Sequence, residues 1–253
     1  MYAPFPTAAQ SHQHSLETLN LLYEFDDFME SIGSVVDMGC GKEGLDLEWW
    51  ATRTTREEDS PEPLNIKCTG VDLIPTTLSA KNHKNIVYLQ RNFEEFEDDV
   101  KFDVVWCHDS FQYVLDPLGT LSKWWNKIND GGMLIMILPQ TTNVHFNELA
   151  FDQWAGCFHN YTVVSLIHQL SVNGFDCNGG FFKKSSNDAW LHAIVYKSEH
   201  SPMDPRNTSW YEIDEKGLLP ESVSRGLTRY GHVRQRDLVL PWLDKSLSWF
   251  GKQ

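Results

Sequence analysis

Residues 35–44 read Val35-Val36-Asp37-Met38-Gly39-Cys40-Gly41-Lys42-Glu43-Gly44, and this stretch decides the fold. An apolar run passes through an acidic residue into a glycine-rich turn, and a helical pattern follows over 45–51. Glycine lets a backbone turn sharply and lets a ligand approach it closely. The first N–H groups of a helix have no partner within the helix, so they point into such a turn. The stretch therefore predicts a binding loop of the nucleotide type.

Short β-branched runs alternate with helical stretches after this loop. The runs expected to form strands are Ser34–Met38, Lys67–Asp72, Ile86–Gln90, Phe102–Cys107 and Met133–Leu138. The stretches expected to form helices between them are Leu45–Ala51, Thr76–His83 and Leu118–Ile128, and 129–132 is expected to be a turn. Alternation of this kind is typical of a parallel sheet with helices on both faces.

The flanking segments extend this α/β pattern. Apolar residues recur at three-to-four spacing from His14 to Ile32, which predicts one amphipathic helix before the first strand. A helix over Tyr161–Val172 precedes two strand-like runs, Phe175–Phe182 and Leu191–Lys197, and such a pair can be antiparallel and close one edge of the sheet. We therefore expect a doubly wound, mostly parallel seven-stranded sheet with one antiparallel edge strand.

Changes in composition divide the chain into three segments. Residues 1–33 are an N-terminal segment with its helix, 34–200 are the ligand-binding domain, and 201–253 are an extension rich in aromatic residues. We expect the extension to pack on the domain or on a partner subunit, and the second arrangement would give a homodimer. Residues 52–66 are polar and contain two prolines, which predicts a surface insertion.

The composition limits the partners and the compartment. The 253 residues have a formal net charge of -14, which opposes binding to nucleic acid or to an anionic membrane surface, because both need clustered basic residues. A local basic patch could still come from Arg225, Arg229, Arg234 and Arg236. The five cysteines are scattered and favour free thiols in a reducing compartment. Since the first residues lack a signal-peptide pattern and no apolar run reaches about 18 residues, we expect a cytoplasmic protein without a membrane span.

Two features of the glycine loop argue against a dinucleotide, although its three glycines match that fingerprint formally. Asp37 lies two residues before the first glycine, where it would repel a pyrophosphate. Asp72 lies 72 − 44 = 28 residues beyond the last glycine, against roughly 20 in the dinucleotide pattern. The insertion at 52–66 can explain the second feature, so the first has more weight. An acid before the loop suits a cationic ligand without phosphates, such as S-adenosylmethionine with its sulfonium and amino groups.

The chain resembles the class I S-adenosylmethionine-dependent methyltransferases through segments that occur in the same order. The segments are Val36–Gly41 for the first motif, Gly70–Leu73 for the second, Asn92-Phe93 for the adenine-edge position, Phe102–His108 for the fourth strand, and Asp116–Leu118 and Asp130–Leu134 for the helix start and fifth-strand turn. The resemblance is strongest over 34–138, and the order of elements extends it to about 197. It implies a Rossmann-like fold and S-adenosylmethionine as the methyl donor.

The resemblance also implies which residues bind the donor. They are Asp37, Gly39, Cys40, Gly41, Asp72, Leu73, Asn92, Phe93, His108 and Asp109. In the family, the acid that corresponds to Asp72 binds both ribose hydroxyls. The sequence departs from the family pattern because its third glycine is one residue later and because Asn92 stands where Asp is more frequent. No metal site is expected, and His12-x-His14 is interpreted as part of a polar, irregular terminus.

His108 is the candidate catalytic residue. Together with Asp109 it follows the fourth strand, and ligands of open α/β sheets bind outside the carboxyl ends of the strands. Both residues are therefore expected near the transferred methyl group. A general base is needed only if the acceptor atom is protonated at neutral pH.

The acceptor is expected to be a small molecule with an O, N or C nucleophile. Residues 108–111 differ from the N-P-P-Y motif of enzymes that methylate adenine or cytosine nitrogen atoms. The stretch Asp109–Pro117 resembles small-molecule methyltransferases that include quinone-biosynthesis enzymes, and the Trp-rich extension resembles stand-alone methyltransferases of bacteriophages. Two alternatives remain open. One is a protein or RNA methyltransferase with the four arginines at the pocket mouth, and the other is a non-catalytic binding or assembly protein that keeps the fold.

Overall fold

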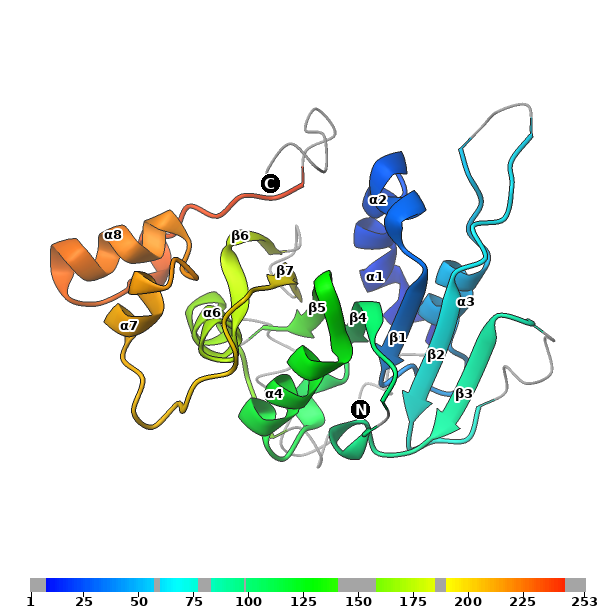
Figure 1. Cartoon of the computed structure of the whole chain (residues 1–253), viewed down its shortest axis with the longest axis horizontal. Coiled ribbons are helices and arrows are strands. Elements are labelled where there is room, and N and C mark those ends of the chain that lie inside the picture. Colours follow the sequence, from blue (N-terminus) through cyan, green and yellow to red (C-terminus); the bar gives the residue numbers. More distant parts are fainter. Residues whose placement is uncertain are drawn as a thin grey trace, which may run out of the picture.

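The computed structural model describes residues 8–56, 60–76, 83–97, 99–140, 158–184 and 190–243, with side chains from residue 12 onward. Its centre is a seven-stranded sheet with helices on both faces (Figure 1). The strands are β1 (Ser34–Met38), β2 (Lys67–Asp72), β3 (Ile86–Gln90), β4 (Phe102–His108), β5 (Ile128–Pro139), β6 (Phe175–Lys184) and β7 (Trp190–Lys197). The helices are α1 (Ala8–Leu22), α2 (Asp26–Ser31), α3 (Leu45–Ala51), α4 (Pro117–Lys127), α6 (Val163–Val172), α7 (Trp210–Glu215) and α8 (Glu221–Tyr230).

The order of the strands across the sheet is β3-β2-β1-β4-β5-β7-β6. β1 pairs in parallel with β2 on one side and with β4 on the other, so the chain reverses its direction of travel across the sheet between them. β7 runs antiparallel to both β5 and β6. These pairings confirm the mostly parallel, doubly wound sheet with an antiparallel strand near one edge, and they place that strand one position inside the edge strand β6. Open α/β sheets bind ligands at the carboxyl ends of the strands where the strand order reverses.

Alternate residues of the central strands face opposite sides of the sheet. Val36 of β1 and Val105 of β4 belong to a buried cluster with residues of α4, α6, α7 and α8. Val35 and Trp106 belong to a second cluster with residues of α1, α2 and α3. Because a strand places successive side chains on opposite faces, a strand covered on both faces needs a nearly continuous apolar run.

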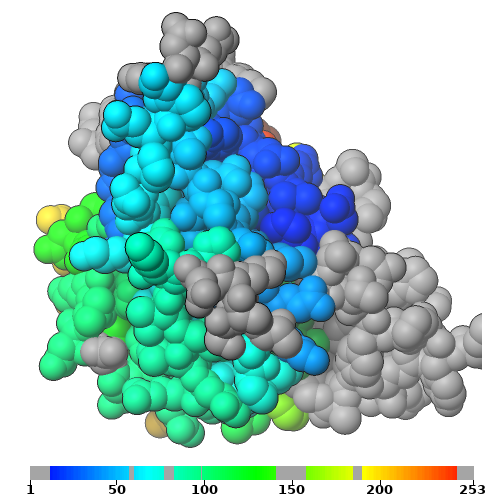
Figure 2. Space-filling view, turned by 90° about the vertical axis from the view of Figure 1, so that its right-hand side faces the viewer, coloured from blue at the N-terminus to red at the C-terminus, as the bar shows by residue number. Residues whose placement is uncertain are grey.

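The N-terminal segment differs from the single helix predicted over His14–Ile32. The chain forms α1 and α2 as separate helices with a turn between them. In that turn the N–H group of Phe25 donates to the carbonyl of Leu22, and both side chains are buried. The apolar spacing continues through the turn, so the pattern alone did not reveal it. Figure 2 shows this N-terminal helical segment (dark blue) beside the segment that contains α3 (lighter blue).

The start of β5 also differs from the prediction. Residues 129–132, expected to form a turn, lie within β5, and Gly131 has a φ of 79°. The pairing of β4 with β5 shifts register between Phe102 and Val104. The glycine therefore serves a bulge inside a longer strand. The other predicted elements within the described residues agree with the structure to within two residues at each end, and most of the helix predicted at Thr76–His83 lies outside those residues.

Backbone hydrogen bonds order two segments outside the sheet, and in one of these segments they reach the sheet. In the region predicted as an insertion, the N–H group of Thr55 donates to the carbonyl of Glu62 over 2.7 Å, and the loop projects from the body of the molecule (Figure 1). In the extension, the carbonyl of Leu218 accepts from the N–H group of Cys177 on β6 over 3.0 Å. Within the described part of the chain, no helix is long and apolar enough to cross a membrane.

Candidate functional site

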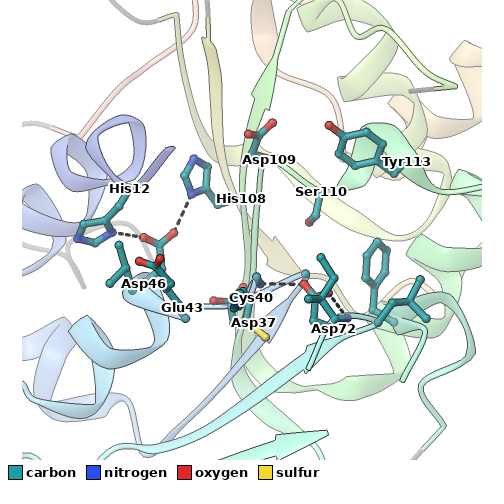
Figure 3. Close-up of a pocket in the computed structure, with 18 residues that line it drawn as sticks. His12, Asp37, Cys40, Glu43, Asp46, Asp72, His108, Asp109, Ser110 and Tyr113 are labelled. Carbon is teal, nitrogen blue, oxygen red and sulfur yellow. Dashed lines mark hydrogen bonds and ion pairs between the residues drawn. The ribbon is translucent and has the colours of Figure 1, made fainter. Parts of the chain in front are cut away.

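A cavity of about 380 Å³ lies at the carboxyl ends of β1, β2 and β4, where the strand order reverses. Its walls come from the glycine loop after β1, the first turn of α3, the residues that follow β2 and β4, and one residue of α1 (Figure 3). Nine of the ten predicted donor-binding residues line it, and only Asn92 does not. Residues that the sequence analysis did not assign to the site also line it, among them His12, Glu43, Asp46, Ser110 and Tyr113.

The first turn of the loop requires glycine at position 39. Gly39 has a φ of 91°, a conformation that side chains disfavour. A Cβ atom at this position would lie 2.3 Å from Cβ of Ser110, which closes the turn from the β4 side. The N–H group of Gly39 donates to the carbonyl of Val71 over 2.8 Å, so the loop is fixed to β2 as well. The loop is therefore packed between two strands and presents its backbone to the cavity.

Asp72 at the end of β2 holds the second turn of the loop. One carboxylate oxygen accepts from the N–H group of Gly41 over 2.8 Å, and the other accepts from the N–H group of Ile74 over 2.9 Å. Each carboxylate oxygen has a further lone pair, so both can still accept from hydroxyl groups of a ligand. Leu73 lines the same end of the cavity, and 64% of it is exposed.

The thiol of Cys40 takes part in hydrogen bonds that hold the glycine loop. Its thiol donates to the Tyr88 hydroxyl over 3.2 Å, and that hydroxyl donates to the carbonyl of Gly41. Burial, and secondarily the nearby Asp37, raise the pKa of the Cys40 thiol, so it remains protonated at neutral pH. This chain of hydrogen bonds ties the loop to β3, and Cys40 is not an activated nucleophile.

Asp37 at the end of β1 is a buried acid without local compensation. It is 2% exposed and lines the cavity. None of the described residues donates a hydrogen bond to its carboxylate, and burial, followed by the nearby Asp46 and Asp72, raises its pKa well above the ordinary value. A buried carboxylate of this kind is neutral unless a cation or hydrogen-bond donors come to it. The geometry therefore favours a ligand that brings positive charge or N–H groups.

Of the two residues predicted at the adenine edge, Phe93 lines the cavity and Asn92 does not. The side chain of Asn92 accepts from the N–H group of Glu94 over 3.0 Å and caps the short turn Phe93–Glu95 (η2). Phe93 lines the cavity, and its ring also packs against that of Trp124. The apolar ring of Phe93, and not the amide of Asn92, thus forms this part of the wall.

Asp109 and Ser110, the two residues after β4, form another part of the cavity wall. Asp109 has a φ of 50°, which is uncommon for a residue other than glycine and is often found at functional sites. Its carboxylate accepts from the side-chain amide of Gln112 over 2.7 Å. The hydroxyl of Ser110 donates to the carbonyl of Met38 over 2.6 Å, which fixes this turn against the end of β1.

Asp46 and His108 form a buried pair at the same end of the cavity as His12 (Figure 3). Nδ1 of His108 lies 2.8 Å from one carboxylate oxygen of Asp46, and His12 contacts the other oxygen. Burial alone would raise the pKa of Asp46, but the charge and hydrogen bonds of His108, His12 and Ser15 outweigh it, and the pKa of Asp46 lies well below its ordinary value. Burial would likewise lower the pKa of His108, and Asp46 reverses that effect and raises it.

Asp46 and His12 are the principal residues that the sequence analysis missed. The signal for Asp46 was an acid three and four residues before Trp49 and Trp50, which places a polar group on the same helix face as two tryptophans. His12 and His14 were assigned to an irregular terminus, and this was wrong because α1 begins at Ala8 and carries both. Among the described residues, no group of three or more His, Cys, Asp or Glu side chains has a geometry that could hold a metal ion.

Comparison with known proteins agrees with this geometry. Residues 36–136 match the family model of a methyltransferase domain. The chain is 24% identical over 208 residues to the ubiquinone biosynthesis O-methyltransferase of Glaesserella parasuis, covering 72% of this chain and 83% of that protein. In fold it is similar to the N-methyltransferase NodS of Bradyrhizobium japonicum in complex with S-adenosylhomocysteine, with a TM-score of 0.52 at 13% identity over 77% of this chain and 90% of that chain. It is also similar to the Burkholderia thailandensis 1,6-didemethyltoxoflavin-N1-methyltransferase, with a TM-score of 0.52 at 12% identity over 79% and 94% of the two chains.

The glycine loop and the acids at the ends of β1 and β2 lie within the matched residues, whereas β6 and β7 lie beyond them. The match over residues 36–136 and the similarity to an O-methyltransferase show that the protein is a methyltransferase, with S-adenosylmethionine as its methyl donor.

Proposed function

We propose that the cavity binds S-adenosylmethionine and that the protein transfers the methyl group to a small-molecule acceptor. The observation that carries this proposal is Asp37, a buried carboxylate that lines the cavity without a donor from the described residues. A cavity of about 380 Å³ is within the usual range for small-molecule sites. The two acids fit S-adenosylmethionine. Its cationic amino or sulfonium group would compensate Asp37, and its ribose hydroxyls could donate to the free lone pairs of Asp72.

In this proposal, Asp37 and the loop Gly39–Gly41 hold the methionine portion, Asp72 and Leu73 the ribose, and Phe93 the adenine. Asn92 would act through its cap of the Phe93 turn. When bound, S-adenosylmethionine supplies a methyl group that is already activated by the sulfonium. The protein therefore mainly positions the acceptor and excludes water. His108 and Asp109 are proposed to face the acceptor side, with His108 as the candidate catalytic residue.

The position of the arginines supports a small acceptor. Arg225, Arg229, Arg234 and Arg236 lie on α8 and the residues after it, and none of them lines the cavity. Arg234 pairs with Asp237, and Arg225 lies near Glu221. A protein or RNA methyltransferase was expected to place these arginines at the pocket mouth, so that alternative lacks this support. The ubiquinone-biosynthesis relative and the toxoflavin enzyme both support a small aromatic or quinone-type acceptor.

Calorimetry with S-adenosylmethionine tests the donor site. We expect saturable binding to the wild-type protein and a loss of affinity of about tenfold or more in Asp72→Ala, because two charge-assisted contacts disappear. Asp116→Ala is a matched control, since Asp116 caps the α4 helix and does not line the cavity. Absence of binding at millimolar ligand would contradict the proposal. Incubation with labelled donor and separate metabolite, protein and RNA fractions would then identify the acceptor class.

Three further expectations remain proposals. We propose a cytoplasmic location, which the free thiols of Cys40, Cys68, Cys107 and Cys177 support. We propose 1–33, 34–200 and 201–253 as the segments of the chain, and burial of Ile213, Leu218 and Leu227 in the cluster on the α4–α6 side supports packing of the extension on its own domain. A homodimer through the extension and an origin in a bacteriophage would need direct tests, by sedimentation and by genomic context.

A further inference from the structure

Asp46 is the most heavily bonded side chain at the cavity, and this inference about it rests on the proposed function. It lies in the first turn of α3 and is 7% exposed. One carboxylate oxygen accepts from the Ser15 hydroxyl over 2.6 Å and contacts His12, both on α1. The other accepts from the indole N–H group of Trp106 over 3.0 Å and lies 2.8 Å from Nδ1 of His108. Two elements of the fold, α1 and β4, therefore converge on one buried carboxylate of α3.

This arrangement determines where neutral His108 carries its proton. The indole of Trp106 can only donate, and the donors around Asp46 keep the carboxylate ionised, so it can only accept. Nδ1 of His108 must then carry the hydrogen, which leaves Nε2 with a free lone pair. Nε2 is buried, and no described residue forms a hydrogen bond with it. In Figure 3 this nitrogen lies on the edge of the ring that faces away from Asp46.

The titratable groups around His108 include two histidines that burial keeps neutral. The surrounding groups are Asp46 on α3, Asp109 after β4, His12 and His14 on α1, and His192 on β7. Burial lowers the pKa of His14 to about 4 and that of His192 to about 4, so both are neutral at pH 7. The ring centroids of His14 and Trp190 lie 5.9 to 6.3 Å from that of His108, in edge-on arrangements.

We propose that Asp46 is a positioning residue that orients His108, that Nε2 of His108 takes a proton from the acceptor, and that the acceptor is a hydroxyl compound. A hydroxyl group must lose its proton as its oxygen becomes an ether oxygen, whereas a neutral amine can be methylated first and lose its proton afterwards. As the new oxygen–carbon bond forms and the sulfur–carbon bond breaks with its electron pair left on sulfur, the hydroxyl proton moves to Nε2. The carboxylate of Asp46 compensates the charge that appears on the imidazole, and the proton then leaves to solvent.

Nitrogen-15 NMR of the His108 imidazole tests the orientation without any acceptor, in the free protein and with S-adenosylhomocysteine. We expect the Nδ1–H tautomer at high pH. In Asp46→Asn we expect the pKa of His108 to fall by about one unit or more, because the charge is lost while the side-chain shape is kept. Glu48→Gln is the matched control, since Glu48 lies on the same helix and contacts His83 instead, 3.2 Å away. An Nε2–H tautomer in the wild-type protein would overturn the proposal, and this result is decisive even if Asp46→Asn does not fold.

Turnover with labelled donor tests the chemical step. We expect an O-methyl product, a kcat about 10²-fold lower in Asp46→Asn, and little change in the KM for the donor. The acidic limb of the pH profile should move to lower pH in this variant, because the base must be unprotonated and its pKa has fallen. A labelled N-methyl or C-methyl product, or no product while calorimetry still shows donor binding, would overturn the hydroxyl assignment. Loss of donor binding in the wild-type protein would instead refute the proposed function.

Discussion

Asp37 and Asp46 line the same cavity and are both almost fully buried, at 2% and 7% exposure, yet their pKa values shift in opposite directions. Burial raises the pKa of Asp37 because no described residue donates a hydrogen bond to its carboxylate. The pKa of Asp46 is lowered despite burial, because His108, His12 and Ser15 surround it. Burial by itself therefore does not decide the charge of an acid. Asp46 is compensated by its neighbours in the fold, whereas no described residue compensates Asp37.

The largest effect is expected for Asp46→Ala. Removing one partner of a buried, hydrogen-bonded charge network costs about 3–5 kcal/mol of the free energy of unfolding, because the remaining groups lose their partner. Urea denaturation at pH 7 measures this loss. The folded pKa of Asp46 is depressed, so its stabilisation is fully present above the ordinary value of 3.8 and is lost as the pH falls through the folded pKa. An Asp46→Ala protein as stable as wild type would show that the network does not stabilise the fold.

Gly39→Ala should have the next largest effect. The added Cβ would meet Ser110 at 2.3 Å in a backbone conformation with a positive φ. We expect a loss of about 1–3 kcal/mol in the free energy of unfolding and weaker donor binding, because the loop must change its conformation. Gly217→Ala provides a control, since its φ is also positive, at 71°, and nothing lies within 4 Å of its added Cβ. Equal effects of the two substitutions would show that the close approach to Ser110 is unimportant.

Asp37→Asn should separate stability from binding. Burial raises the pKa of Asp37 and so favours its protonated form, which Asn resembles in shape and charge, and the free energy of unfolding should change by less than about 1 kcal/mol. The dissociation constant for S-adenosylmethionine should rise about tenfold or more, because a charged hydrogen-bond acceptor is lost. Calorimetry and urea denaturation of the same preparations measure both quantities. Unchanged affinity would remove Asp37 from the donor site.

The raised pKa of Asp37 also predicts a pH dependence. Its protonated form stabilises the empty fold, and this stabilisation is lost as the pH rises through the folded pKa. A cationic donor binds the ionised form, so the increase in Tm caused by S-adenosylmethionine should grow as the pH rises through the same range. Asp37→Asn should flatten this dependence. Thermal unfolding with and without donor between pH 5.5 and 8, at about half-unit steps, provides the measurement.

The smallest effect is expected for Glu48→Gln. Glu48 and His83 lie 3.2 Å apart, but their side chains are 26% and 24% exposed, so water screens the pair. We expect a loss of less than about 1 kcal/mol, as for other solvent-exposed pairs. Urea denaturation measures the free energy of unfolding. A larger loss than this would show that burial does not explain why the Asp46–His108 pair stabilises the fold more than Glu48–His83.

Most of the sheet could be predicted because its strands are continuous apolar runs separated by turn residues. The positions of the loop residues and of Asp72 could be predicted as well, because each of them directly follows or ends a strand. The break between α1 and α2 could not be predicted, because the apolar spacing is the same in one helix or two. The bulge at Gly131 could not be predicted either, because the same glycines suit a turn or a bulge. His12 was missed because its partner is 34 positions away in the sequence.

The sequence by itself determined the fold class, because strand periodicity is a local pattern, and Asp37 together with the family resemblance indicated the methyl donor. Only the tertiary structure decided which acids carry charge. Asp46 receives its hydrogen bonds from α1 and β4, which come together only when α1 and α3 pack on the same face of the sheet. The physical reason is that the charge state of a buried group depends on donors within a few ångströms, and the distance along the chain does not determine which donors those are.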